Sequence, residues 1–256
     1  FLQLLPLLKK NKKNMKFAII AAGEGSRLAA EGITSPKPLV KVGGEHLIDR
    51  LIRIFMDNQA EEIVVICNDQ TTLVSSHLVE LQRDGLNGRP VPLRFVIKST
   101  PSSMHSFSEI SKYLEDGPFV LTTVDTIFRE SEFRSYVDSF NKALTEGTAD
   151  GMMGVTDYID DESPLHVDVD GNMRITGFLD SSDHPHYISG GIYGLNGKAI
   201  RVLQLCMENG LSRMRNFQRA LVAVGVRLQA YPFSKVLDID HAADIAKAEN
   251  FLGKGE

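Results

Sequence analysis

The sequence predicts an α/β protein built on a doubly wound, mostly parallel (Rossmann-like) sheet, with antiparallel additions in its second half. Up to Asp150, short apolar runs alternate with amphipathic segments at the spacing of strands and helices. After Asp150, strand-like segments follow one another directly. A chain of 256 residues is long enough for one large domain of this kind.

In the first half, the run KFAIIAA (16–22) is continuously apolar and ends in glycine, as a buried parallel strand does. An irregular stretch is expected from there to Val40. The same alternation predicts helix 47–55, strand 61–67, helix 73–81, strand 92–98, helix 106–114, strand 118–124 and helix 130–144. Strands separated by helices at this spacing are expected to pair in parallel.

In the second half, consecutive strands without crossover helices indicate antiparallel pairing. Four such strands are predicted at 151–159, 166–170, 172–179 and 186–195. Helices then follow at 198–207 and 214–224, with a last strand at 226–233 before the segment DIDHAADIAKAENFL.

The first 14 residues form a separate segment, in which an apolar run broken by Pro6 precedes four lysines. A secretory signal carries its positive charge before the apolar run, and a membrane span needs roughly 20 apolar residues. Met15 opens the first strand, so we interpret residues 1–14 as an extension or tag. Cys67 and Cys206 form no CxxC pair or disulfide framework, which favours a cytoplasmic location without a membrane partner.

The net charge of the chain limits the kinds of molecule that it is expected to bind. It is formally −5, and the body of the chain is near −9 once the four N-terminal lysines are left out. A body this acidic repels a phosphate backbone at long range, so we expect no nucleic-acid partner. A phosphate site must then come from a local concentration of donors and metal.

Gly23 and Gly25 follow the first strand directly, where glycine lets the backbone turn sharply and present N–H groups to an anion. Leu28 stands where a Rossmann fingerprint needs its third glycine, and the loop lacks the Gly-Lys-Ser/Thr of a Walker loop. What remains is a glycine loop with Arg27 close behind and Lys37 between two prolines further on. Both cations are placed to bind a triphosphate held by the loop.

The segment FAIIAAGEGSRL, followed by SPKPLVKVGGEHLIDRLI, resembles the opening of the nucleoside-triphosphate transferase superfamily, which includes sugar-1-phosphate nucleotidylyltransferases. The order Gly-x-Gly-x-Arg and then Pro-Lys is matched without gaps, and the resemblance is specific over residues 16–56. It implies that the loop and Arg27 hold the triphosphate and that Lys37 binds phosphate of the incoming nucleotide. The implied nucleotide-binding residues are Ala22, Gly23, Gly25, Ser26, Arg27 and Lys37, with Arg27 and Lys37 as the catalytic pair.

Two aspartates are candidate metal ligands. Mg²⁺ takes oxygen ligands, usually one or two carboxylates plus substrate phosphates, and Asp125 follows a central strand, where ligands of open α/β sheets collect. A lone Asp there also fits a helix or turn cap, but the resemblance places a metal-binding Asp at this point. The late Asp-Ile-Asp segment resembles the family's as well, so Asp238 is the second expected Mg²⁺ ligand and Asp240 is expected to cap the following helix.

The acceptor site is expected in the second half of the chain. The strand YISGGIYGL (187–195) resembles the family strand that borders the sugar, so Gly190 and Gly191 are expected to bind the acceptor, with a β-bulge as the alternative. Glu162 resembles an acidic residue that binds sugar hydroxyls in some relatives. Lys235 is placed either to reach the acceptor's phosphate or to be solvated.

The base is expected near STPSSMHSFSEI (99–110), where relatives wrap a loop around it. Ser102 and Ser103 are candidates to bind the base, and capping of the following helix is the alternative. The resemblance implies one nucleotidyltransferase domain over residues 15–256, with a nucleotide-binding half at 15–150 and an acceptor-binding half at 151–256. The nucleobase, the acceptor and the oligomeric state are not fixed by the sequence.

Together these features predict a Mg²⁺-dependent nucleotidyltransferase that transfers a nucleoside monophosphate from a nucleoside triphosphate to a phosphorylated small molecule and releases pyrophosphate. A sugar 1-phosphate is the favoured acceptor. The alternatives are a cytidylyltransferase for phosphocholine or a similar phosphorylated alcohol, and a non-catalytic nucleotide-binding regulatory module. A glycosyltransferase of related topology typically carries Asp-x-Asp after a central strand, whereas Asp125 is followed by Thr126 and Ile127.

Overall fold

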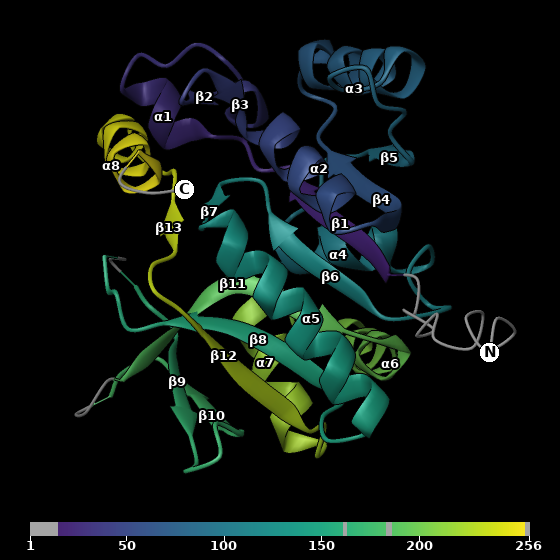
Figure 1. Ribbon diagram of the computed structural model, residues 1–256, viewed down its shortest axis with the longest axis vertical. Helices are drawn as coiled ribbons and strands as arrows, with labels where there is room; N and C mark the ends of the chain where they lie inside the picture. Colours follow the sequence, from purple (N-terminus) through teal and green to yellow (C-terminus); the bar gives the residue numbers. More distant parts are fainter. Residues whose placement is uncertain (1–14, 161–162, 183–185, 254–256) are drawn as a thin grey trace, which may run out of the picture.

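A computed structural model describes residues 15–160, 163–182 and 186–253 of the chain (Figure 1). Its centre is a nine-stranded mixed sheet in the order β10-β9-β11-β6-β1-β4-β5, with β8 paired to β11 and β12 paired to β8. Helices cover both faces of the sheet. The predicted α/β class, with a mostly parallel sheet and antiparallel strands, is confirmed. In the described part of the chain, every helix is too short or too polar to cross a bilayer.

The parallel part of the sheet comes from the first half of the chain. β1 (Met15–Ala21) lies between β4 (Ala60–Cys67) and β6 (Phe119–Thr123), and β5 (Leu93–Ile97) extends the sheet beyond β4. The order of the strands therefore reverses between β1 and β6. Open α/β sheets bind ligands at such a reversal, at the carboxyl ends of the strands. The glycine loop leaves β1 at this end, and Asp125 leaves β6 beside it.

The antiparallel part comes from the second half. β11 (Tyr187–Leu195) pairs antiparallel with β6, and β8 (Gly151–Thr156) pairs antiparallel with β11. β9 (His166–Val169) and β10 (Ile175–Leu179) continue beyond β11. β12 (Leu228–Phe233) differs from these additions because it runs parallel to β8. Strands from before and after Asp150 belong to the same sheet. The division into a nucleotide-binding half and an acceptor-binding half stays a prediction.

The two faces of the sheet carry separate hydrophobic clusters. Residues of β1 alternate between them, so that Phe17 and Ile19 face one cluster while Ala18 and Ile20 face the other. The first cluster lies under α2 (Leu47–Asp57), α3 (Thr72–Asp84), α5 (Glu130–Glu146) and α8 (Ala242–Leu252). The second lies under α4 (Ser103–Ser111), α6 (Gly197–Glu208) and α7 (Met214–Ala223).

The stretch before Val40, expected to be irregular, contains two short elements instead. They are α1 (Ser26–Ala30) and a 3-10 turn, η2 (Lys37–Leu39), and they are followed by a small hairpin of β2 (Lys41–Val42) and β3 (Glu45–His46). Each is too short to carry a hydrophobic periodicity, which is why the apolar pattern does not predict them.

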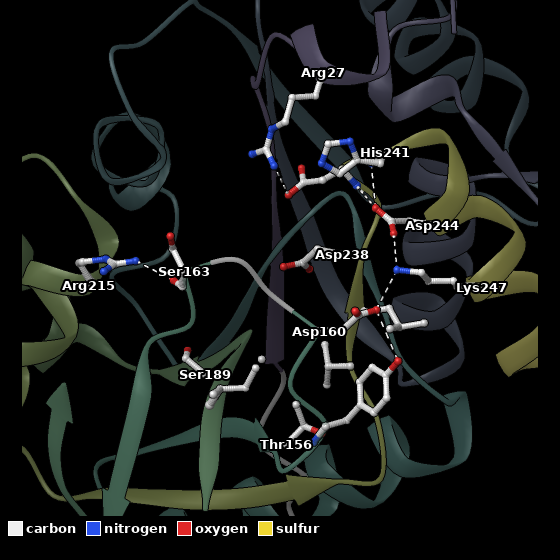
Figure 2. Close-up of a pocket in the computed structure, with 16 residues that line it drawn as sticks. Arg27, Thr156, Asp160, Ser163, Ser189, Arg215, Asp238, His241, Asp244 and Lys247 are labelled. Atoms are coloured by element: carbon white, nitrogen blue, oxygen red, sulfur yellow. Dashed lines mark hydrogen bonds and ion pairs between the residues drawn. The ribbon is translucent and has the colours of Figure 1, made fainter. Parts of the chain in front are cut away.

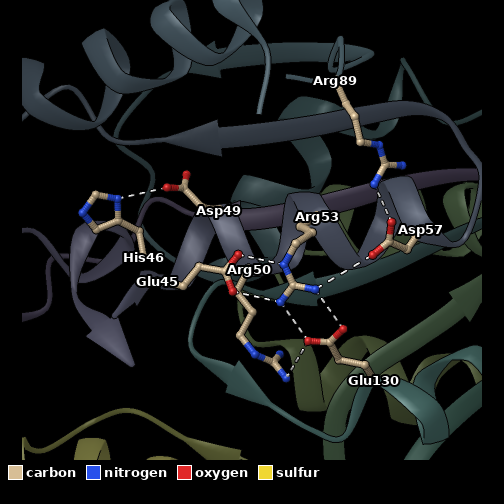
Figure 3. A network of polar contacts seen from close by, with 8 residues as sticks. All are labelled: Glu45, His46, Asp49, Arg50, Arg53, Asp57, Arg89 and Glu130. Carbon is tan, nitrogen blue, oxygen red and sulfur yellow. Dashed lines mark hydrogen bonds and ion pairs between the residues drawn. The ribbon is translucent and has the colours of Figure 1, made fainter. Parts of the chain in front are cut away.

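An ionic network ties this hairpin to the core helices (Figure 3). From α2, the Arg53 guanidinium donates to both carboxylate oxygens of Glu45 (2.8 and 2.9 Å) and to both of Glu130 (2.9 and 2.8 Å). These bonds raise the pKa of Arg53, so it stays charged. Because Glu45 lies in β3 and Glu130 opens α5, one side chain holds three elements together.

Asp150, just before β8, ties the start of this strand to α6 and to the residue before β12. It accepts hydrogen bonds from the Arg227 guanidinium (3.0 and 3.1 Å), the Arg227 N–H (3.2 Å) and the Lys198 ammonium (2.7 Å). The bonds from Arg227, together with Lys198, hold the pKa of Asp150 well below its usual range. The carboxylate is therefore held in its charged form at neutral pH.

Asp150→Asn is expected to lower the free energy of unfolding at neutral pH by roughly 1.5–3 kcal/mol, the usual contribution of bonds to a charged group. Because the folded pKa is depressed, the stabilisation is present above the unfolded pKa of about 3.9 and is lost as the pH falls below it. Urea unfolding between pH 3 and 7 measures this. Asp84→Asn is the control, since Asp84 is exposed and forms its ion pair with its exposed neighbour Arg83; equal effects of the two variants would contradict the assignment.

Candidate active site

The loop after β1 depends on glycine for its backbone conformation and is held in place by hydrogen bonds from Asn68. Gly25 has a left-handed backbone (φ 64°) and caps α1, and a Cβ there would lie 3.2 Å from Lys37 Cβ. A side chain at position 25 would therefore crowd Lys37, and glycine also suits the left-handed backbone there. Asn68, which follows β4, donates from its amide to the carbonyls of Ala22 (3.4 Å) and Gly23 (3.2 Å).

Lys37 lies among carboxylates at the end of the loop. Its ammonium forms ion pairs with Asp125 and with Asp240 Oδ1 (2.8 Å), and only 11% of its side chain is exposed. Burial acts to lower the pKa of Lys37, but the two carboxylates raise it above its ordinary value. Lys37 is therefore a fixed positive charge.

Asp125 and Asp238 are brought together by a two-stranded ribbon. β7 (Thr126–Ile127) follows Asp125 directly and pairs antiparallel with β13 (Leu237–Asp238), so that Asp238 lies opposite Thr126. One step further, the Ile239 N–H donates to the carbonyl of Asp125 (3.2 Å). Burial and the nearby carboxylates of Asp238 and Asp125 together raise the pKa of Tyr193, so its hydroxyl stays protonated beside them.

Asp240 does not cap α8, and that expectation was wrong. The N-cap is His241, which forms a capping box with Asp244. Asp240 instead accepts from Arg27 Nη1 (3.0 Å) and from Lys37. Although burial opposes ionisation, the hydrogen bond from Lys37 and the charges of Lys37 and Arg27 lower the pKa of Asp240 overall. The second Asp of the Asp-Ile-Asp segment thus binds both predicted catalytic cations.

The start of α8 is fixed against α1 by a second contact. Glu31 accepts from the Ala242 N–H (2.7 Å), and its other oxygen lies 2.6 Å from His241 Nδ1. The bond from His241 lowers the pKa of Glu31, and the same bond raises the pKa of His241. This contact keeps Asp240 within reach of Arg27.

A pocket of about 620 Å³ opens beside these residues (Figure 2). Asp238 lies at its centre, with Arg27 and His241 on one side and Ser163 and Arg215 on the other. The lining residues are Arg27, Thr156, Tyr158, Asp160, Ser163, Ile188, Ser189, Gly190, Arg215, Val236, Leu237, Asp238, Asp240, His241, Asp244 and Lys247. The pocket thus lies between Arg27, which is predicted to bind phosphate, and residues of the second half of the sheet.

The glycine pair of β11 forms the predicted β-bulge and also borders this pocket. Ser189 pairs with Val155 and Ile192 with Gly154, so Gly190 and Gly191 are inserted between adjacent partners. Gly190 lines the pocket, and a Cβ there would lie 3.1 Å from Val236 and 3.2 Å from a backbone oxygen. The bulge therefore presents bare backbone to the pocket.

Other predicted residues lie elsewhere. Ser102 caps α4 by accepting from the His105 N–H (3.4 Å), Ser103 begins that helix, and neither lines the pocket. The Lys235 ammonium lies 3.7 Å from the ring centre of Tyr158, a cation–π contact, instead of lining the pocket. Glu162 lies outside the described residues.

Several pocket residues were not found from the sequence. Lys247 of α8 bonds Asp160 (2.9 Å) and Asp244 (3.2 Å), and Arg215 of α7 donates to the carbonyl of Ser163 (3.1 Å). The spacing of Asp244 and Lys247 places them on one face of a helix and is the only sequence signal for this group. Nothing in the sequence relates either residue to Asp160.

Three carboxylates, those of Asp125, Asp238 and Asp240, are the candidates to hold Mg²⁺ beside the glycine loop. Lys37 already places a positive charge against Asp125 and Asp240, and Asp238 lies across the ribbon from Thr126. These three carboxylates do not form a close group of ligand atoms; among the described residues, such a group is found only on α2 and α3. Because Mg²⁺ usually takes one or two carboxylates and fills its shell with phosphate and water, the residues fit an ion that arrives with a nucleotide.

Residues 17–158 match the MobA-like NTP transferase domain. The chain belongs to this family. A glucose-1-phosphate cytidylyltransferase from Salmonella typhimurium is 22% identical over 166 residues, which cover 56% of this chain and 64% of that protein. A bifunctional IPC transferase and DIPP synthase from Thermococcus kodakarensis is 27% identical over 110 residues, which cover 43% of this chain and 23% of that protein. The match thus spans less than two thirds of these curated relatives.

Two solved structures share the fold over nearly the whole chain. The inositol-1-phosphate CTP transferase from T. maritima superimposes with a TM-score of 0.73 at 20% identity, covering 95% of this chain and 98% of that one. The CTP:phosphocholine cytidylyltransferase from Streptococcus pneumoniae gives 0.73 at 16% identity, covering 93% and 99%. At these identities the likeness establishes the fold of this family member, including its antiparallel second half.

Gly25→Ala is expected to destabilise the protein by roughly 1–2 kcal/mol, the cost of a left-handed backbone in an L-residue, and to displace Lys37. Gly23→Ala is the matched control, because a Cβ there meets no atom within 4 Å; it is expected to stay within about 0.5 kcal/mol of the wild type. Denaturant unfolding of both variants measures the difference. Equal stability of the two would show that the contact between Gly25 and Lys37 is not required.

Proposed function

We propose that this protein is a Mg²⁺-dependent nucleotidyltransferase that joins a nucleoside monophosphate to a phosphorylated small molecule and releases pyrophosphate. The observation that carries the proposal is the convergence of three distant segments: Arg27 of α1 with Lys37 of η2, Asp125 after β6, and Asp238 of β13 with Asp240 just beyond it. Membership of the NTP transferase family supports it. The pocket beside them has room for a second small substrate.

The chemistry proposed is an in-line displacement. An acceptor phosphate oxygen attacks the α-phosphorus, the bond from that phosphorus to the bridging oxygen breaks, and pyrophosphate leaves. The acceptor oxygen is already anionic near neutral pH, so the site needs no strong general base. Catalysis then consists of holding two anions together and neutralising charge on the departing pyrophosphate.

Each residue has a part in that scheme. Arg27 and Lys37 bind the triphosphate and the leaving group, and Asp240 orients both cations through its two oxygens. Asp125 and Asp238 would hold Mg²⁺, which supplies additional positive charge to the phosphates when bound. The bulge at Gly190 and Gly191 exposes backbone for the acceptor.

We favour CTP as the nucleotide. The relatives and structural neighbours include a glucose-1-phosphate cytidylyltransferase, an inositol-1-phosphate CTP transferase and a CTP:phosphocholine cytidylyltransferase. These three share CTP and differ in the acceptor, so the acceptor stays open between a sugar or cyclitol phosphate and a phosphorylated alcohol. The structural neighbours also include a putative glucose-1-phosphate thymidylyltransferase from Bacillus anthracis and a UDP-glucose pyrophosphorylase, so the choice of CTP rests on the curated relative and on two of these four structures. Both cysteines are buried and free, which supports a cytoplasmic location.

The test is a pyrophosphate-release assay with Mg²⁺, four nucleoside triphosphates and a panel of glucose 1-phosphate, inositol 1-phosphate and phosphocholine. Release that requires both CTP and one acceptor is expected. Lys37→Ala is expected to reduce turnover by on the order of 10²–10³, as removal of a preorganised donor does. Lys142→Ala, on the exposed face of α5, is the control. Binding of nucleotide without release for any acceptor would favour a regulatory module, and release of a nucleoside diphosphate would indicate a glycosyltransferase.

The two aspartate assignments can be separated by their dependence on Mg²⁺. Asp125→Asn and Asp238→Asn are each expected to raise the half-saturating Mg²⁺ concentration by more than about tenfold, since even outer-shell losses cost roughly 10–100-fold in metal affinity. Asp240→Asn is expected to lower turnover without changing the Mg²⁺ requirement, because its partners are Arg27 and Lys37. A shifted requirement in Asp240→Asn and not in Asp238→Asn would reverse the two roles.

A further inference from the structure

A histidine-rich cluster lies on α2 and α3, apart from the pocket. His46 ends β3 and is the N-cap residue of α2, Asp49 lies in the first turn of α2, and His77 lies on α3. Asp49 Oδ2 is 3.0 Å from His46 Nδ1, and Asp49 Oδ1 is 2.6 Å from His77 Nε2. Each carboxylate oxygen therefore faces one imidazole nitrogen.

The donor atoms of the three residues already converge. One ligand atom from each lies within 4.8 Å of the other two, and the imidazole rings meet edge to face at 5.2 Å. Zinc binds imidazole nitrogen and carboxylate oxygen at about 2.0–2.2 Å, which in a tetrahedral site separates the ligand atoms by roughly 3.3 Å. To admit an ion, the contact of Asp49 with His46 (3.0 Å) would need to lengthen by about 0.3 Å and the contact with His77 (2.6 Å) by about 0.7 Å.

The backbone around the cluster is well fixed. His46 pairs with Lys41 in the hairpin, and Figure 3 shows His46 and Asp49 together at the start of α2. Buried residues anchor both helices next to the ligands, namely Ile48 and Leu51 on α2 and Val74 and Leu78 on α3. The three side chains keep 26%, 13% and 20% of their surface exposed, so water can reach the cluster and fill a fourth position.

The composition of the cluster selects the kind of ion. Two imidazoles and one carboxylate suit Zn²⁺ and neighbouring transition metals, whereas Mg²⁺ prefers an all-oxygen shell. None of the three residues lines the pocket. A metal here is thus chemically and spatially separate from the Mg²⁺ of the proposed reaction.

We propose that His46, Asp49 and His77 form a binding site for a transition-metal ion of the Zn²⁺ type, with water completing its coordination. The ion would link the start of α2 to α3, which otherwise meet here through hydrogen bonds to Asp49. Binding to the folded state alone stabilises it in proportion to metal occupancy.

Co²⁺, a spectroscopic substitute for Zn²⁺, tests the site in the full chain after chelator treatment, with any affinity tag removed and Mg²⁺ in excess to fill the carboxylate sites. One equivalent of Co²⁺ is expected to give the visible absorption of a four-coordinate ion, and Zn²⁺ is expected to displace it. Saturating Zn²⁺ is also expected to raise the melting temperature. Absence of saturable binding in the wild type would overturn the proposal.

Two variants assign the ligands. His77→Gln and His46→Asn are each expected to weaken Co²⁺ binding by more than the roughly 10–100-fold caused by loss of an outer-shell partner. Asparagine is a preferred N-cap residue, so His46→Asn removes the imidazole while keeping the start of α2. Both variants are expected to retain Mg²⁺-dependent pyrophosphate release, which separates this proposal from the proposed function.

The matched control is His105→Gln, because His105 lies on α4, outside the cluster, and its Nδ1 lies 2.9 Å from the hydroxyl of Ser102. It is expected to bind Co²⁺ like the wild type. Equal binding by His77→Gln and His105→Gln would show that any metal uptake occurs at another site, and the proposal would be wrong.

Discussion

The arrangement of the candidate active site depends on the short ribbon between β7 and β13. Two residues of β13 pair with two residues of β7, more than a hundred positions earlier in the chain. This pairing brings the C-terminal segment back to the carboxyl end of β6. It places Asp240 against Lys37 and Arg27, so that a lysine with only 11% of its side chain exposed has two carboxylate partners. Burial removes water from the ammonium group, and with fewer carboxylate partners this desolvation penalty would not be compensated.

The strand order of the sheet explains why this ribbon brings the residues of the candidate site together. Because the strand order reverses between β1 and β6, the glycine loop and Asp125 leave the sheet side by side. The antiparallel β11 then places its bulge on the far side of β6, where Gly191 approaches the hydroxyl of Thr126. The nucleotide-binding loop, the carboxylates and the bulge therefore meet at one edge, although they come from four separate parts of the chain.

Sequence reasoning predicted the fold from the alternation of strand runs and amphipathic segments. It singled out Gly25, Arg27 and Lys37 from a local pattern, and Asp125 and Asp238 from the resemblance to the family, and the structure brings Arg27, Lys37 and Asp125 to one end of the sheet beside the ribbon that carries Asp238. Asp240 was misassigned because an Asp before a helix fits a cap equally well, and only the pairing of β13 shows that it faces Lys37. The His46 and His77 cluster had no signal either, since the residues lie 31 positions apart, one at the end of β3 and the other on α3.

The balance of charge links nucleotide and metal in the proposed reaction. In the ligand-free protein, Arg27 and Lys37 are matched by Asp125 and Asp240. A triphosphate that draws these cations toward itself leaves the carboxylates without their counter-charges, in a site where burial makes unpaired charge costly. In the proposed reaction, a divalent cation held by Asp125 and Asp238 would restore the balance of charge. Each of the two ligands should therefore strengthen the binding of the other, since coupling between sites is reciprocal.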